Sequence, residues 1–155
     1  MTPLSLRFQV HDHPNVRYLG SPLPVVRLVV DARMRLTDGT ESETYEGAVD
    51  TGAYITVLPR YVWRTSEREI LTPNILFGGV KPTKRCQVRA DLARVTCVLS
   101  DREGYEAEPL TIPTYLAHTD RAPLLVGFAG LPSRYRMRID PSTGEAWLRE
   151  GTKIG

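Results

Sequence analysis

The sequence predicts an all-β protein, folded as a small closed barrel-like lobe with at most one or two short helices. Short runs in which β-branched and apolar side chains dominate, or alternate with polar ones, recur along the chain and are separated by Gly- and Pro-containing turn signals. No amphipathic pattern of helical period extends over more than a few turns. With 155 residues, the chain is long enough for one domain with a core of its own.

The pattern divides the chain into one domain and two terminal segments. Residues 4–10 can form a short strand, whereas 14–24 contains three prolines and is predicted to be an extended connection. We therefore predict an N-terminal extension at 1–24, a folded domain at 25–150 and a C-terminal tail at 151–155.

Turn signals and β-rich runs define the elements of the domain in order. The run 25–30 is apolar and β-branched, and Asp38-Gly39 is a turn signal that returns the chain into a strand at 42–49. Pro59 favours a short helix over 59–64, because proline is tolerated at the first helical position. The further predicted strands are 33–36, 86–92, 95–99, 109–116, 125–127 and a C-terminal hairpin of 135–139 and 145–148.

Composition argues against several classes of function. The net charge of +2 gives no electrostatic case for nucleic acid, and no apolar run approaches membrane-spanning length, so we expect a cytoplasmic protein without a membrane partner. Cys86 and Cys97 are expected to be free buried thiols. The cluster His11-Asp12-His13 is expected in a surface loop and not at a metal site, because it offers too few ligands.

The most informative segment is the run Ala48–Ala53, which reads Ala-Val-Asp-Thr-Gly-Ala. Glycine lets the backbone approach closely and threonine can hydrogen-bond within a turn, so the carboxylate of Asp50 is presented at a rigid position. Three residues alone can occur by chance, but the apolar residues on both sides are typical of a loop between two buried strands. The segment resembles the active-site loop of retropepsin-like aspartic proteases.

Two further segments carry the resemblance. Leu124–Gly127 has the two apolar residues and the glycine that in this family form a strand behind the catalytic loop. Ile75–Pro82 resembles the flap, a hairpin that closes over the substrate, although an ordinary hairpin turn without a gating role is the alternative. The resemblance implies these substrate-binding residues: Ala53, Tyr54, Phe77, Gly78, Gly79 and Val80.

The resemblance implies a homodimeric endopeptidase. One Asp-Thr-Gly supplies half of an active site, so Asp50 of each copy would meet across a two-fold axis and share one proton. The ionised carboxylate would activate a water that attacks a peptide bond, and the protonated one would polarise the carbonyl. The implied catalytic residues are Asp50, Thr51 and Gly52, the substrate is a peptide or protein, and neither a metal nor a cofactor is required.

Tyr54 and Phe128 depart from the viral members of the family. Those members carry an acidic or amide residue after Asp-Thr-Gly-Ala that pairs with an arginine after the downstream glycine. Here both positions are aromatic, which is consistent with an apolar contact in place of the ion pair and points to a cellular, bacterial branch. Two alternatives stay open: a non-catalytic dimerisation or binding module, and a self-processing protease that cleaves its own N-terminal segment.

Overall fold

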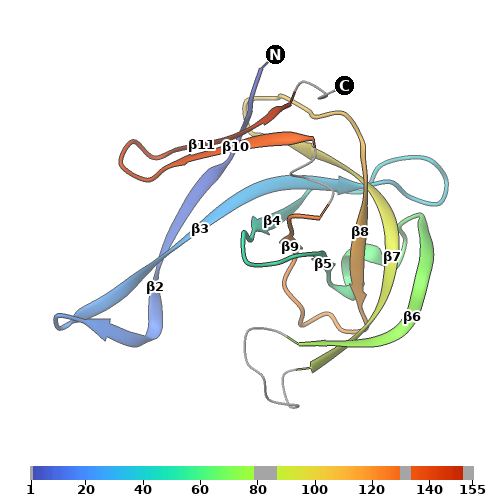
Figure 1. The fold of residues 1–155 in the computed structure, drawn as a ribbon, viewed down its shortest axis with the longest axis horizontal. Helices are drawn as coiled ribbons and strands as arrows, with labels where there is room; N and C mark the ends of the chain where they lie inside the picture. The colour runs from blue at the N-terminus through green and yellow to red at the C-terminus, as the bar shows by residue number, and fades with distance from the viewer. Residues whose placement is uncertain (1, 79–86, 130–133, 152–155) are drawn as a thin grey trace.

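The computed structural model describes residues 2–78, 87–129 and 134–151 and has an all-β fold, which confirms the predicted class (Figure 1). Within these residues the strands are β1 (Leu4–Ser5), β2 (Arg7–Tyr18), β3 (Ser21–Met34), β4 (Tyr45–Val49), β5 (Thr56–Leu58), β6 (Arg68–Gly78), β7 (Gln87–Ser100), β8 (Leu110–Ala117), β9 (Leu125–Val126), β10 (Tyr135–Asp140) and β11 (Glu145–Glu150), and one short helix, α1, spans Arg60–Trp63.

The strands form two sheets. Eight of them follow the order β2-β3-β4-β9-β5-β8-β7-β6, and three follow the order β1-β11-β10. Strand β3 pairs with β4 over Leu28–Ala32 and with β7 over Asp31–Met34, so it connects two distant parts of the larger sheet. Strands β4 and β9 are parallel. Their carboxyl ends therefore leave the sheet side by side, and the candidate site is built there.

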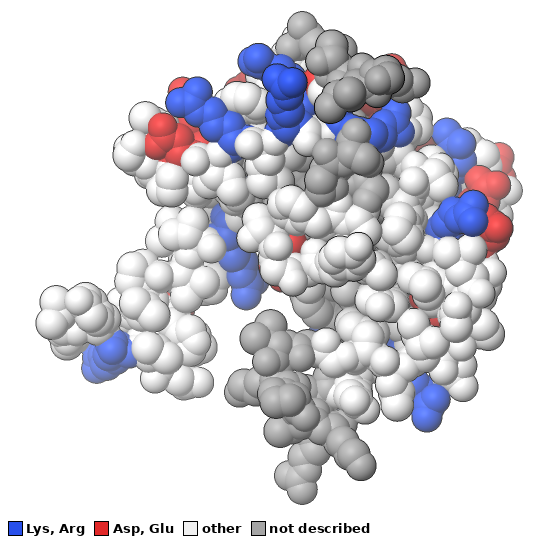
Figure 2. Space-filling view, viewed as in Figure 1, with Lys and Arg blue, Asp and Glu red and all other residues white. Residues whose placement is uncertain are grey.

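The predicted connection at 14–24 is wrong, because these residues belong to a long hairpin of β2 and β3. Its tip is a turn at Leu19 and Gly20, which have φ of 49° and 80°. Proline is tolerated because β2 is an edge strand and its ladder with β3 is irregular between Asp12 and Arg17. The His11–His13 cluster accordingly lies on a strand and not in a loop. Figures 1 and 2 show this hairpin standing away from the rest of the molecule.

The two ends of the described chain meet in the smaller sheet. Leu4 of β1 lies opposite Leu148 of β11, and both side chains are buried. The predicted C-terminal hairpin is confirmed: β10 and β11 are antiparallel, and Asp140 accepts a hydrogen bond from the Ser142 N–H (3.1 Å) in the turn between them. Residues at the N-terminus thus contribute to the same packed structure as the C-terminal hairpin.

Two other local predictions are confirmed and two are wrong. Gly39 has φ +83° at the predicted turn, and the short helix follows Pro59. The strands predicted separately at 25–30 and 33–36 are one strand, β3, which ends at Met34, and those predicted at 86–92 and 95–99 are one strand, β7. Arg94 does not interrupt β7, because it is the exposed member of an alternation whose neighbours Ala93 and Val95 are buried.

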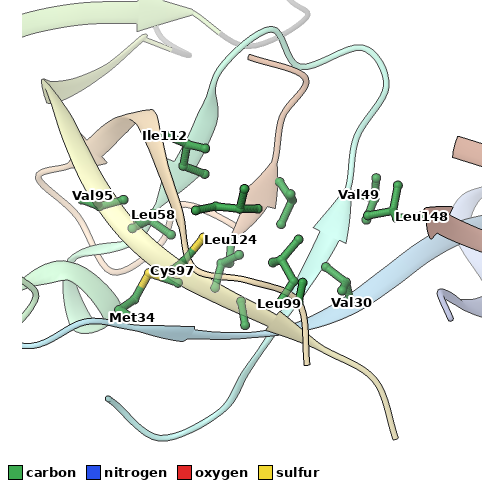
Figure 3. Close-up of a cluster of buried hydrophobic side chains, with 14 of the residues drawn as sticks. Val30, Met34, Val49, Leu58, Val95, Cys97, Leu99, Ile112, Leu124 and Leu148 are labelled. Atoms are coloured by element: carbon green, nitrogen blue, oxygen red, sulfur yellow. The ribbon is translucent and has the colours of Figure 1, made fainter. Parts of the chain in front are cut away.

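The core lies between the strands of the larger sheet and extends to the smaller one (Figure 3). Side chains from β3, β5, β7 and β8 fill it, and Leu148 of β11 reaches the same cluster. Cys97 is a free thiol inside this core, where burial raises its pKa to about 12. Cys86, the second predicted buried thiol, lies outside the described residues.

Candidate active site

The loop after β4 holds Asp50 by backbone hydrogen bonds on both sides. The Asp50 N–H donates to the Val126 carbonyl of β9 (3.1 Å), which fixes the start of the loop to the neighbouring parallel strand. The Gly52 N–H then donates to Asp50 Oδ1 (2.8 Å), and the Ala53 N–H donates to the Asp50 carbonyl (3.2 Å). The partly exposed carboxylate is therefore oriented by its own turn.

A second turn, after β9, packs directly against this loop at Gly127. A side chain there has no room, because a Cβ on Gly127 would lie 2.5 Å from the Ile55 carbonyl carbon and 2.7 Å from the Thr56 nitrogen. The Gly127 N–H donates to the buried Thr56 Oγ1 (3.1 Å). The two loops are therefore held in van der Waals contact, because Gly127 has no side chain and Thr56 accepts its N–H.

The pairing of the two loops continues for two more residues. The Phe128 N–H donates to the Ala53 carbonyl (3.0 Å), and the Ala129 N–H donates to the Tyr54 carbonyl (2.7 Å). The Tyr54 and Phe128 side chains line a shallow cavity of about 420 Å³, where Tyr54 is 81% exposed. Backbone hydrogen bonds thus join the segments that carry Tyr54 and Phe128, the two residues that differ from the viral pattern.

The last residues of β6, Phe77 and Gly78, line the same cavity as the Asp50 loop. Phe77 of β6 stacks on Tyr115 of β8, with ring centroids 4.7 Å apart and planes 4° apart, so its position is fixed. Gly78 is the last residue of β6. The predicted site residues Gly79 and Val80 lie outside the described residues.

A cavity of about 610 Å³ lies between the Asp50 loop and Phe77. It brings together the predicted residues Asp50, Gly52, Ala53, Tyr54, Phe77 and Gly78. Val57 and Leu125 also line it, as do Ile55, Leu76 and Tyr115, which the sequence reasoning missed.

Thr51 is the predicted catalytic residue that does not line this cavity. It lies with Asp50 at a second groove, of about 600 Å³, which opens on the other side of the loop toward β3. Asp50 and Leu125 line both depressions, and Asp50 is the one of the two that carries a charge. A carboxylate at this position is accessible both to a ligand beside Phe77 and to a molecule that docks on the β3 side.

The described side chains that line the cavity beside Phe77 are apolar apart from the Asp50 carboxylate and the Tyr54 and Tyr115 hydroxyls. Among the described residues that line it, Asp50 is the only Asp, Glu, Lys or Arg. A bound ligand would exclude water from one side of this carboxylate, and desolvation strengthens its electrostatic interactions.

A polar cluster lies midway along the β6–β7 hairpin. Asp91 Oδ1 accepts the Asn74 N–H (2.8 Å) and lies 3.1 Å from His118 Nε2, while Arg89 donates to the Asn74 side chain (2.8 Å). Asn74 has φ 54°, where β6 bends away from a regular ladder. Partial burial raises the pKa of Asp91, but the hydrogen bonds from Asn74 and His118 outweigh burial and leave this pKa below its ordinary value.

Two structural findings and two comparisons with known proteins bear on ligands and relatives. Within residues 2–78, 87–129 and 134–151, no three His, Cys, Asp or Glu side chains are grouped so that they could hold a metal ion. The described part of the chain contains no helix of the length and apolar character needed to cross a membrane. No protein-family model matches the sequence, and no curated protein matches it at a significant level.

Proposed function

We propose that this chain is one subunit of a homodimeric aspartic endopeptidase with a retropepsin-like fold. The observation that carries the proposal is the Asp50 carboxylate, oriented by the Gly52 N–H (2.8 Å) at the edge of an apolar cavity of about 610 Å³. A fixed carboxylate beside a space for apolar side chains is the half of the site that one subunit of such a peptidase contributes.

The strand pairing supports a closed lobe. Strand β3 pairs with β4 on one side and with β7 on the other, and the order between them is β4-β9-β5-β8-β7. A run of strands that begins at β3 and comes back to pair with β3 has the connectivity of a small barrel. The interlocked loops after β4 and β9 lie at one end of this lobe, where a second copy could bring its own Asp50 close.

Two Asp50 carboxylates at a two-fold axis would divide the chemistry between them. Like charges a few ångströms apart favour a shared proton, so one carboxylate is ionised and the other protonated. The ionised group takes a proton from water as the water oxygen bonds to the scissile carbonyl carbon, and the protonated group hydrogen-bonds the carbonyl oxygen. The carbon–nitrogen bond then breaks, and the leaving amine takes a proton from the pair.

The cavity indicates the kind of peptide that would fit. Ile55, Val57, Leu76 and Leu125 supply apolar walls, and the stacked Phe77 and Tyr115 rings close one side. A peptide with a large apolar side chain next to the scissile bond would bury that side chain there, at about 1.5–3 kcal/mol for full burial. Acidic side chains at that position would lose hydration beside the Asp50 carboxylate and bind poorly.

A non-catalytic binding module is the second candidate. It is favoured by the isolation of Asp50 within one chain, because the described residues that line the cavity beside Phe77 include no second carboxylate. A module of this kind would bind a peptide in the same cavity without cleaving it.

Replacement of the carboxylate separates the two candidates. Asp50→Asn keeps the shape and the acceptor for the Gly52 N–H but removes the base, so peptide cleavage should fall to the uncatalysed level while the fold is kept. Asp120→Asn, at an exposed position between β8 and β9, is the matched control and should cleave as the wild type does. The assay is mass-spectrometric detection of products from a peptide library, with a statine-type inhibitor as a second probe.

Full cleavage by purified Asp50→Asn would refute the protease proposal. Peptide binding by the wild-type chain without any cleavage, and without statine binding, would favour the module.

A further inference from the structure

The outer halves of β2 and β3 form a feature that the proposed chemistry does not use. Residues 10–26, here called the arm, pair from Val10 opposite Val26 to Tyr18 opposite Ser21. Figure 1 shows the arm projecting from the body, and Figure 2 shows an open hollow between the arm and the rest of the molecule. An ordered two-stranded ribbon with no covering layer is marginally stable in water by itself.

The arm is rich in exposed apolar side chains and poor in charge. Tyr18 is 66% exposed, Leu19 at its tip 87% and Val10 at its base 65%, and Val16 and Val26 are exposed as well. Among the residues of the arm, Asp12 and Arg17 are the only Asp, Glu, Lys or Arg. Apolar side chains gathered on a projecting element indicate a contact surface.

The prolines of the arm determine how such a contact can form. Pro14 lies on β2, an edge strand, and Pro22 and Pro24 lie on the part of β3 that precedes its pairing with β4 at Leu28. Proline cannot donate a backbone hydrogen bond, so both outer edges of the arm are poor templates for strand addition. A partner would therefore meet the faces of the arm, where the apolar side chains lie.

The base of the arm is continuous with the Asp50 loop. The groove of about 600 Å³ on the β3 side is lined by Val26 and Leu28 of β3, by Asp50 and Thr51, and by Ile139 of β10. A molecule that reaches Asp50 from this side therefore contacts the root of the arm.

We propose that the arm clasps a second copy of this chain, with each arm lying over the body of its partner beside the Asp50 loops. This assembly rests on the proposed dimeric site and names the surface that holds it together. A two-fold axis near Asp50 makes the contact isologous, so each copy both gives and receives an arm and the assembly closes as a dimer.

The area of the arm is adequate for this role. A ribbon about 25 Å long and about 10 Å wide has a face of about 250 Å². Two arms and the two surfaces that they cover then bury about 1,000 Å², a large part of the roughly 1,200–2,000 Å² typical of stable interfaces. The contacts between the Asp50 loops would supply the remainder.

The test alters the tip of the arm without weakening its turn. Leu19 has φ 49°, a conformation that aspartate tolerates better than leucine, so Leu19→Asp with Tyr18→Ser should leave the hairpin intact while removing its apolar surface. The matched control is Ile70→Asp with Leu71→Ser on β6, where the two side chains are also exposed. Sedimentation equilibrium of the full chain gives the dimer Kd, and circular dichroism checks the fold of each variant.

The arm variant should raise the dimer Kd by about tenfold or more, and the β6 control should change it less than about twofold. A photoreactive phenylalanine analogue in place of Leu19 should give a covalent dimer on illumination. An unchanged Kd in the arm variant, a monomeric wild type, or cross-links confined to one chain would each overturn the proposal.

Cleavage assays separate this outcome from that of the proposed function. If wild-type dimers cleave peptide through Asp50 while the arm variant keeps its Kd, the arm proposal fails and the protease proposal stands. If the arm variant dissociates while Asp50→Asn has no effect on cleavage, the arm proposal stands and the protease proposal fails.

Discussion

The hydrogen bond between the two interlocked loops gives a sharp prediction for stability. Thr56→Val replaces the Oγ1 that accepts the Gly127 N–H (3.1 Å) by a methyl group of similar size. The close approach of Gly127 to Ile55 leaves no space for a water to take the place of the hydroxyl. The substitution thus leaves a buried N–H without a partner.

An unpaired buried N–H costs about 1–3 kcal/mol, which for a domain of this size lowers Tm by about 2–12 °C. Thr114→Val is the matched control: Thr114 is buried too, but its Oγ1 donates to the Ile112 carbonyl two residues away (3.3 Å), and no N–H of another described loop donates to it. The control should therefore lose less stability than Thr56→Val, because it leaves no N–H of another loop without an acceptor.

Urea unfolding followed by tryptophan fluorescence measures both variants. All samples must have the same protein concentration, because dimerisation couples stability to concentration. Thr56→Val should also lower kcat, since Gly127 and Asp50 belong to the same pair of loops. Equal stability losses in the two variants, or full activity in Thr56→Val, would show that this hydrogen bond does not hold the loops together.

Three further predictions concern other parts of the structure. Gly127→Ala should destabilise the chain by about 1–3 kcal/mol and reduce cleavage, because its Cβ would meet the backbone of Ile55; wild-type urea midpoints and rates would contradict this. The folded-state pKa of Asp91 lies below its ordinary value of 3.8, so this carboxylate stabilises the fold above about pH 4 and its contribution is lost as pH falls through the folded pKa. The stability of Asp91→Asn should consequently fall less than that of the wild type as the pH is lowered below about 4. The same loss of stability in both proteins would refute the role of the Asn74 and His118 contacts. In Cys86→Ser, the remaining Cys97 thiol should react with a disulfide reagent at pH 8 only on unfolding, because burial raises its pKa to about 12; rapid labelling of the folded chain would contradict its position in the core.

The parts of the fold that local chemistry dictates could be predicted from the sequence. The turn at Asp38-Gly39 needs a residue that adopts positive φ, and glycine supplies it. The strand–loop–strand arrangement around Asp50 follows from apolar runs on both sides of a turn-forming sequence. Such signals act over a few residues and are visible without knowledge of the packing.

The features that sequence reasoning missed depend on distant contacts. Thr56 accepts a hydrogen bond from a residue 71 positions away, and Tyr115 becomes part of the cavity by stacking on Phe77 of another strand. A threonine within the otherwise apolar run 55–58 was the available signal, because a buried hydroxyl needs a partner. The arm was missed because its prolines indicate a connection in most settings, whereas here they lie on free edges.

The measurement that tests the central claim most directly is the activity of mixed dimers. Wild-type chain and Asp50→Asn are refolded together at increasing proportions of the mutant, and subunit exchange is confirmed with differently tagged chains. If each active site needs two Asp50 carboxylates, about a quarter of the dimers at a one-to-one ratio are fully wild type, and activity per wild-type chain falls to roughly half. A constant activity per wild-type chain across the titration would show that each chain carries a complete site and would contradict the shared-carboxylate account.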